Sequence, residues 1–96
     1  MKVVFTSAAL ADLDDLLSYT SANYPDVLPA LERRIRAVLE RIEQWPESAR
    51  EVSERPGVRV VPLIRYPYRI FYRINADRIV ILHIHHAARD EIDDGR

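Results

Sequence analysis

The chain has 96 residues, of which 48% are hydrophobic and 30% charged, and it contains no cysteine. This length suits one hydrophobic core, so we expect a single domain over residues 1–96, and the apolar fraction is too high for a disordered tail. The lack of cysteine excludes a disulfide framework and a thiolate zinc site, and the formal charge of −1 disfavours a domain whose whole surface binds nucleic acid.

The amino terminus resembles neither a signal peptide nor a membrane anchor. Met1 and Lys2 lead directly into a short strand-like run. No apolar stretch in the sequence is long enough to cross a bilayer. We therefore expect a cytoplasmic protein without membrane contact.

The first two expected elements are a strand and a helix. Lys2–Phe5 is rich in β-formers, and Thr6 offers a hydroxyl that can cap a following helix. The helix should end near Ala22, because Pro25 follows closely. Its leucines recur at helical spacing and are predicted to lie in the core: Leu10, Leu13, Leu16 and Leu17.

The second helix carries the strongest periodic signal in the chain. It should run from about Asp26 to the residue before Pro46 and form an antiparallel hairpin with the first helix. Its apolar residues follow a three-four spacing and predict one buried stripe: Leu28, Leu31, Ile35, Val38, Leu39, Ile42 and Trp45.

After a polar connection over residues 47–57, the pattern changes to three strands. They are expected over Val58–Leu63, Tyr68–Ile74 and Ile79–His85. The last is apolar at nearly every position, which predicts a central strand covered on both faces. A turn of two or three residues around Ala76 and Asp77 joins the last two strands. The length of this turn decides which side chains of the two strands lie opposite one another. The fold class is therefore α+β, in the order β-α-α-β-β-β, with a helical hairpin packed on a mostly antiparallel sheet.

The charges are unevenly distributed along the chain. Every charged residue between positions 12 and 26 is an aspartate, whereas residues 50–78 hold seven arginines against three acids. Arg69 and Arg73 share one face of a strand with Phe71 between them, and such a pair can form a docking patch or pair with nearby acids. Tyr66, expected in a turn, is a further contact candidate.

Two histidines also share a face of the last expected strand. His83 and His85 have a spacing that can in principle bind a metal. No cysteine or carboxylate within the same run completes a set of ligands, so we predict a structural role for them and no metal site.

Four segments together resemble the landmarks of the RelE/ParE superfamily of bacterial toxins. They are Thr6–Leu13, Trp45–Arg50, Arg65–Arg73 and Ile81–Arg89, and they span almost the whole chain. The arginine- and tyrosine-rich strand followed by the histidine-rich strand is the most diagnostic part. The resemblance implies the toxin of a type II toxin-antitoxin system.

Two targets then compete. ParE-like members inhibit DNA gyrase by protein-protein contact without catalysis or a cofactor, and the candidate contact residues here are Arg65, Tyr66, Arg69, Arg73 and Arg89. RelE-like members are ribosome-dependent, metal-independent mRNA endoribonucleases, and this alternative would use Arg69, His83 and Arg89. A third alternative is an inactive scaffold that only binds its antitoxin.

Departures from the nuclease pattern favour the ParE-like interpretation. Val60 and Pro62 stand where nuclease-type relatives have lysines, and the sequence ends in Asp93–Arg96 where they have a tyrosine. The acids of residues 90–94 would also repel a phosphate backbone.

The resemblance also implies a protein partner. We expect a cognate antitoxin with a DNA-binding N-terminal region and a disordered, acidic and amphipathic C-terminal segment that covers the basic part of the chain.

Overall fold

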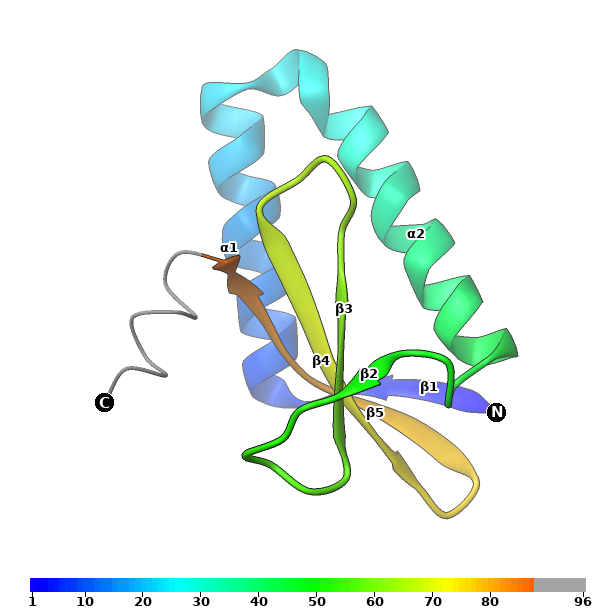
Figure 1. The fold of residues 1–96 in the computed structure, drawn as a ribbon. Coiled ribbons are helices and arrows are strands. Elements are labelled where there is room, and N and C mark those ends of the chain that lie inside the picture. Colours follow the sequence, from blue (N-terminus) through cyan, green and yellow to red (C-terminus); the bar gives the residue numbers. More distant parts are fainter. Residues whose placement is uncertain (88–96) are drawn as a thin grey trace.

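The chain folds into two helices and a five-stranded sheet in the computed structural model, which describes residues 1–87 (Figure 1). The elements follow one another in this order: β1 (Lys2–Phe5), α1 (Ser7–Asn23), the 3-10 turn η1 (Pro25–Val27), α2 (Leu28–Gln44), β2 (Arg50–Glu51), β3 (Val58–Pro62), β4 (Tyr68–Asn75) and β5 (Arg78–His86). The predicted α+β class and order are confirmed, with β2 as an additional strand. Within the described residues, neither helix is long and apolar enough to cross a membrane.

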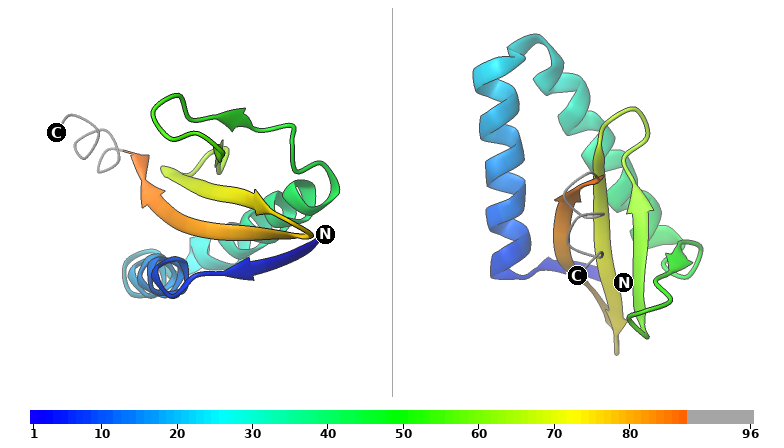
Figure 2. Two further views of the ribbon diagram at one scale, coloured as in Figure 1. Left: turned by 90° about the horizontal axis from the view of Figure 1, so that it is seen from below. Right: turned by 60° about the vertical axis from the view of Figure 1, so that its left-hand side comes forward.

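The strands lie in the order β1-β5-β4-β3-β2. β1 runs parallel to β5, and all other neighbouring strands are antiparallel. Both helices lie on the same side of the sheet (Figure 2). We call that side the helix face and the other side the open face.

The position of β5 corrects one expectation. β5 lies between β1 and β4, so it is an interior strand as predicted. The prediction that it is covered on both faces is wrong, because the helices cover only one side and Val80 and Leu82 remain half-buried.

β2 lies in the segment that we expected to be an irregular connection. Arg50 pairs with Val60, and Glu51 pairs with Arg59. A charged strand of two residues has no periodic signature in the sequence, so its pairing is imposed by the tertiary structure.

Thr6 joins the start of α1 to β5. Its Oγ1 accepts a hydrogen bond from the Ala9 N–H at 3.0 Å and donates one to the Leu82 carbonyl at 3.0 Å. The first bond satisfies one of the N–H groups that a helix leaves free at its start. The second fixes the helix start against the strand.

The buried face of α1 differs from the predicted leucine stripe. Ala9, Leu16 and Thr20 are buried, whereas Leu10 is 54% exposed. Leu10 lies about 100° around the helix from Ala9, so a stripe that begins at Ala9 leaves it outside. Thr20 tolerates burial because its hydroxyl donates to the Leu16 carbonyl at 2.8 Å.

The stripe of α2 is confirmed at its centre, whereas Leu28 and Leu39 are only partly buried and the last member is exposed. Leu31, Ile35, Val38 and Ile42 are buried. Trp45 is 56% exposed, because it caps the helix with a φ of −133° and a ψ of 72° and its side chain leaves the helical stripe. Opposite these helices, the sheet contributes Leu63, Ile70, Tyr72, Ile79, Ile81 and Ile84 to the same core.

A β-bulge in β5 sets the orientation of its second half. Tyr72 lies opposite Ile81, but the preceding Phe71 lies opposite His83, so Leu82 is the extra residue. A single extra residue reverses the alternation of side chains beyond it.

The contribution of Thr6 to the stability of the fold can be tested by substitution. Thr6→Ala removes the cap and the bond to Leu82, so we expect the free energy of unfolding to fall by about 1–2 kcal/mol. Urea unfolding followed by circular dichroism measures this change. Ser7→Ala, at an exposed neighbouring position, should change stability by less than about 0.5 kcal/mol. Equal losses in the two variants would contradict the assigned role of Thr6.

Candidate functional site

The predicted contact residues separate into two groups on the molecule. Arg69 and Arg73 of β4 lie on the open face, with the buried Phe71 between them. Arg65 and Tyr66 lie instead in the loop between β3 and β4, at a groove beside the helices. Arg89 lies outside the described residues. The four candidates that the structure describes therefore do not form one patch.

The histidines of β5 face the open side because of the bulge. His83 lies opposite Phe71, and His85 lies opposite Arg69. In a regular strand without the bulge, both imidazoles would lie on the helix face with Ile81, because residues two apart share a face. The hairpin turn consists of Ala76 and Asp77, which settles the register: Arg69 is the direct neighbour of His85 and not of His83.

A carboxylate from α1 reaches these histidines around the edge of β5. The Asp12 Oδ2 atom accepts a hydrogen bond from the Ile84 N–H at 2.9 Å and lies 3.6 Å from the His83 Nδ1 atom. The ring centroids of His83 and His85 are 4.8 Å apart, and the ring centroid of His85 is 5.4 Å from that of Phe71.

Sequence reasoning did not include Asp12 among the site residues. It is separated from Ile84 by 72 positions in the chain. In the sequence it appears only as one acid in the first turns of a helix. Its role depends on β1 ending at Phe5, which leaves the β5 edge beyond Ile81 without a strand partner.

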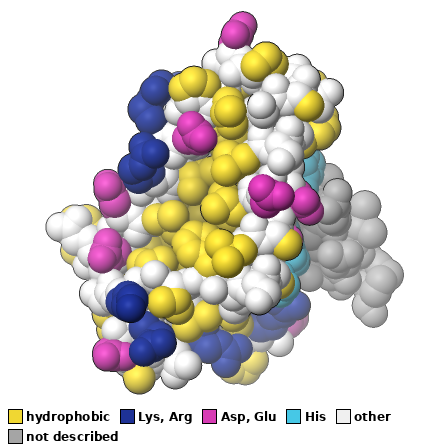
Figure 3. Space-filling view, turned by 180° about the vertical axis from the view of Figure 1, so that it is seen from behind, with side chains coloured by type: hydrophobic (Ala, Val, Ile, Leu, Met, Phe, Trp, Pro, Cys, Tyr) yellow, Lys and Arg dark blue, Asp and Glu magenta, His cyan; other side chains and the backbone are white. Residues whose placement is uncertain are grey.

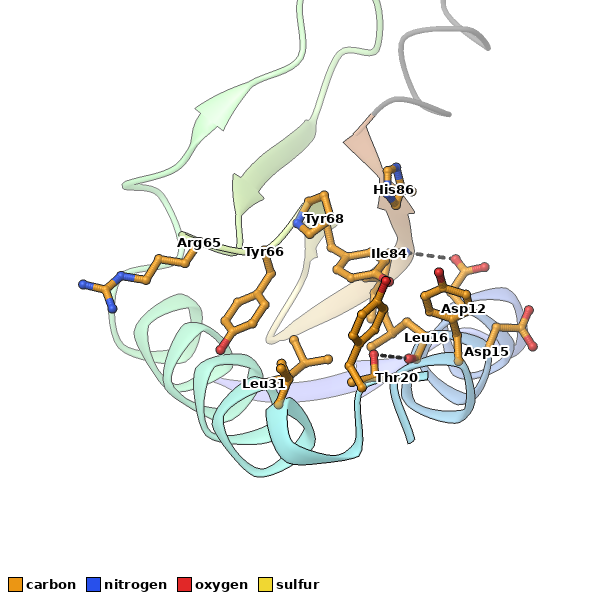
Figure 4. Close-up of a pocket in the computed structure, with 14 residues that line it drawn as sticks. Asp12, Asp15, Leu16, Thr20, Leu31, Arg65, Tyr66, Tyr68, Ile84 and His86 are labelled. Carbon is orange, nitrogen blue, oxygen red and sulfur yellow. Dashed lines mark hydrogen bonds between the residues drawn. The ribbon is translucent and has the colours of Figure 1, made fainter. Parts of the chain in front are cut away.

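A groove of about 1010 Å³ opens between the helical hairpin and the end of the sheet. Tyrosines form much of its wall, and Figure 4 shows Tyr66 pointing toward Leu31 of α2. Arg65 lies at one end of the labelled set and Asp15 at the other. The tyrosines that line the groove are Tyr19, Tyr24, Tyr66 and Tyr68.

The helix side of the molecule also carries a continuous apolar strip. In Figure 3 acidic side chains lie on both flanks of this strip, and basic side chains lie along one flank and at the lower end. The helices supply Leu10, which is exposed, and Leu13, Leu17 and Leu39, which are only partly buried. An exposed apolar surface of this kind marks a site of contact with another macromolecule.

A second set of contacts anchors the segment after α2. The buried Tyr72 hydroxyl donates to the Pro46 carbonyl, and Arg59 donates to the carbonyls of Glu47 and Ala49 at 3.1 and 2.8 Å. Burial raises the pKa of Tyr72 above its ordinary value of 10.0, while the positive charge of Arg59 and the backbone at Ala49 partly oppose this rise.

The sequence matches a known protein family over most of its length. Residues 3–91 match the family described as the ParE toxin of the type II toxin-antitoxin system, parDE. The chain belongs to this family of ParE toxins. Toxin ParE3 of Caulobacter vibrioides is 32% identical over 85 residues, which cover 86% of this chain and 83% of that toxin.

Solved structures support the same assignment. The chromosomal ParDE toxin-antitoxin system of P. aeruginosa includes a chain with a TM-score of 0.77 and 28% identity, covering 90% of the present ParE toxin and 95% of that chain. A YoeB/ParE toxin from Agrobacterium tumefaciens has a TM-score of 0.60 at 13% identity, with 90% and 98% of the two chains covered. At that identity the likeness concerns the fold alone.

The buried tyrosine gives a pH dependence that can be measured. Because its pKa is raised, folded Tyr72 keeps its proton at a pH where the unfolded chain already loses it. The contribution of Tyr72 to the free energy of unfolding is therefore complete below about pH 10 and is lost as the pH rises further. We expect Tyr72→Phe to be less stable than the parent by about 1 kcal/mol at pH 8, because the bond to Pro46 is lost. This difference should shrink as the pH rises above about 10 in urea unfolding experiments.

Tyr19→Phe, at an exposed position, is the control. Its stability difference from the parent should stay constant over the same pH range. A constant difference for Tyr72→Phe as well would refute the role assigned to burial.

Proposed function

We propose that this ParE toxin inhibits DNA gyrase by direct protein-protein contact, without catalysing a reaction, and that a cognate antitoxin neutralises it in the cytoplasm. The observation that carries the proposal is the family match over residues 3–91. The gyrase target follows from the resemblance to ParE-like members and from the nuclease-type residues that the sequence lacks.

The open face supports contact with a large partner. Arg73 is exposed, and Arg69, His83 and His85 are half-buried on the same side. Arginine is enriched among the residues that dominate protein-protein binding. We propose that Arg69 and Arg73 are the centre of the gyrase contact, with Arg65, Tyr66 and Arg89 as further contact candidates.

The groove and the apolar strip support a second contact, made by the antitoxin. A groove lined by tyrosines accepts an amphipathic segment, which buries apolar side chains and leaves polar ends for charged ones. We propose that the disordered C-terminal segment of the antitoxin folds into this groove and that its N-terminal region binds DNA. Because Arg65 and Tyr66 belong to the groove, the antitoxin would cover them directly.

The antitoxin contact predicts a local loss of affinity. Tyr66→Ala should weaken binding of the antitoxin encoded beside the toxin by about tenfold or more, since a groove aromatic is removed. Trp45→Ala is the control, because Trp45 is an exposed aromatic side chain that does not line the groove, and its effect should stay within about twofold. Isothermal titration calorimetry gives both values. Equal affinities for the two variants would place the antitoxin elsewhere.

The gyrase contact is tested by supercoiling of relaxed plasmid with purified gyrase and increasing amounts of toxin. We expect inhibition that the antitoxin relieves. Replacement of Arg69 and Arg73 by alanine should raise the half-inhibitory concentration by about tenfold or more. Arg36→Ala, on the exposed side of α2, is the matched control and should behave like the parent.

Other results would redirect the proposal. A folded toxin that arrests growth and cuts transcripts on the ribosome, without inhibiting gyrase, would favour the endoribonuclease alternative. That activity should then fail in variants of Arg69, His83 and Arg89. Overexpression that is harmless without the antitoxin would favour the inactive scaffold.

A further inference from the structure

Three side chains with metal-binding atoms converge at the edge of β5. Asp12 comes from α1, and His83 and His85 come from β5. One ligand atom of each lies within 4.8 Å of the other two. We call these residues the Asp12 cluster.

The distances within the cluster suit a bound ion better than a direct hydrogen bond. At 3.6 Å, the Asp12 Oδ2 and His83 Nδ1 atoms are too far apart for a hydrogen bond. Ligand atoms at about 2.0–2.2 Å from a tetrahedral zinc ion lie about 3.3–3.6 Å from one another. The Asp12–His83 pair already has this spacing, and the ligand atom of His85 lies within 4.8 Å of both.

The surroundings hold the ligands in place. The Ile84 N–H donates to the Asp12 carboxylate and so fixes its direction, in the way that ligating carboxylates are commonly held by further hydrogen bonds. The Phe71 ring packs beside His85. The Asp12 side chain is 27% exposed and that of His83 is 38% exposed, so an ion can enter while the ligands remain constrained.

The chemistry of the donors selects the class of metal. Two imidazoles and one carboxylate suit zinc and similar first-row transition metals, whereas magnesium and calcium require mostly oxygen ligands. Arg69 lies opposite His85 and adds a positive charge on the same face. This charge repels every divalent cation alike, so the selection rests on the two imidazole nitrogens.

We propose that Asp12, His83 and His85 form a binding site for a zinc-type metal ion, with a fourth coordination position open to water. Three protein ligands and one open position are a common zinc arrangement. The ion would join α1 to the second half of β5. The site lies beside Arg69, the proposed centre of the gyrase contact, and Asp12 also lines the groove proposed for the antitoxin. The proposal differs from the expectation from sequence that no metal binds.

The first experiment uses the full chain, purified without a histidine tag and stripped of metal with EDTA. We expect saturable binding of one Zn²⁺ per chain by isothermal titration calorimetry. The thermal midpoint should rise by about 5 °C or more at saturating Zn²⁺ and should not rise with Mg²⁺. Co²⁺ should give the visible absorption bands of a site with nitrogen and oxygen ligands.

Conservative variants identify the ligands. Asp12→Asn keeps an oxygen that accepts from the Ile84 N–H but loses the charge, and His83→Gln and His85→Gln remove one imidazole each. Each variant should bind Zn²⁺ about tenfold or more weakly and lose the Co²⁺ bands. His86→Gln is the matched control, because the next residue along the strand faces the groove, and its binding should equal that of the parent.

The proposal fails if the parent chain binds no Zn²⁺, or if all three ligand variants bind it as the parent does. Circular dichroism in EDTA establishes that each variant is folded before its affinity is compared. The Co²⁺ spectrum reports the ligands directly, so a loss of stability alone cannot imitate the expected result. None of these measurements depends on toxin activity.

Discussion

The edge of β5 beyond Ile81 is completed by α1 instead of by another strand. The backbone N–H of Thr6 donates to the Ile81 carbonyl at 3.0 Å, the Thr6 hydroxyl bonds to Leu82, and the Asp12 carboxylate accepts from Ile84. Backbone groups at a sheet edge need partners, and here the first turns of a helix supply them in succession. This arrangement fixes α1 beside the sheet and places the Asp12 carboxylate next to His83. It also makes α1 one wall of the groove, with the β3–β4 loop on the other side.

The sequence was sufficient for the order of the elements, because hydrophobic periodicity reports which face of a helix or strand is buried. The sequence was misleading at positions where local structure overrides the hydrophobic periodicity. Leu10 fits a helical spacing as well as Ala9 does. The buried face of α1 nevertheless contains the small Ala9 and Thr20, whose hydroxyl bonds to the Leu16 carbonyl of the same helix. Trp45 continues the spacing of α2 only if the helix continues, and the backbone leaves the helical region at that residue.

The candidate site was less predictable than the fold. The side chain that completes the cluster comes from a helix far away in the chain, so no search within the histidine run could find it. The bulge at Leu82 is equally hidden, since no residue there is a glycine or a turn former. Yet this one residue decides that His83 and His85 face the open side with Arg69. The segment Trp45–Arg50 stands out in the sequence only as a family landmark. In the structure its backbone carbonyls accept hydrogen bonds from Tyr72 and Arg59, and these bonds hold the chain after α2 against the sheet.

The two outermost strands are β1, with four residues, and β2, with two. The exposed Arg50 and Glu51 make β2 a short and charged border. Such a border offers few backbone groups for another chain to pair with, and charges at an edge oppose stacking of copies. Over residues 1–87, a toxin that is left without its partner therefore presents apolar surface on its helix side but no long outermost strand on which an ordered fibre can grow.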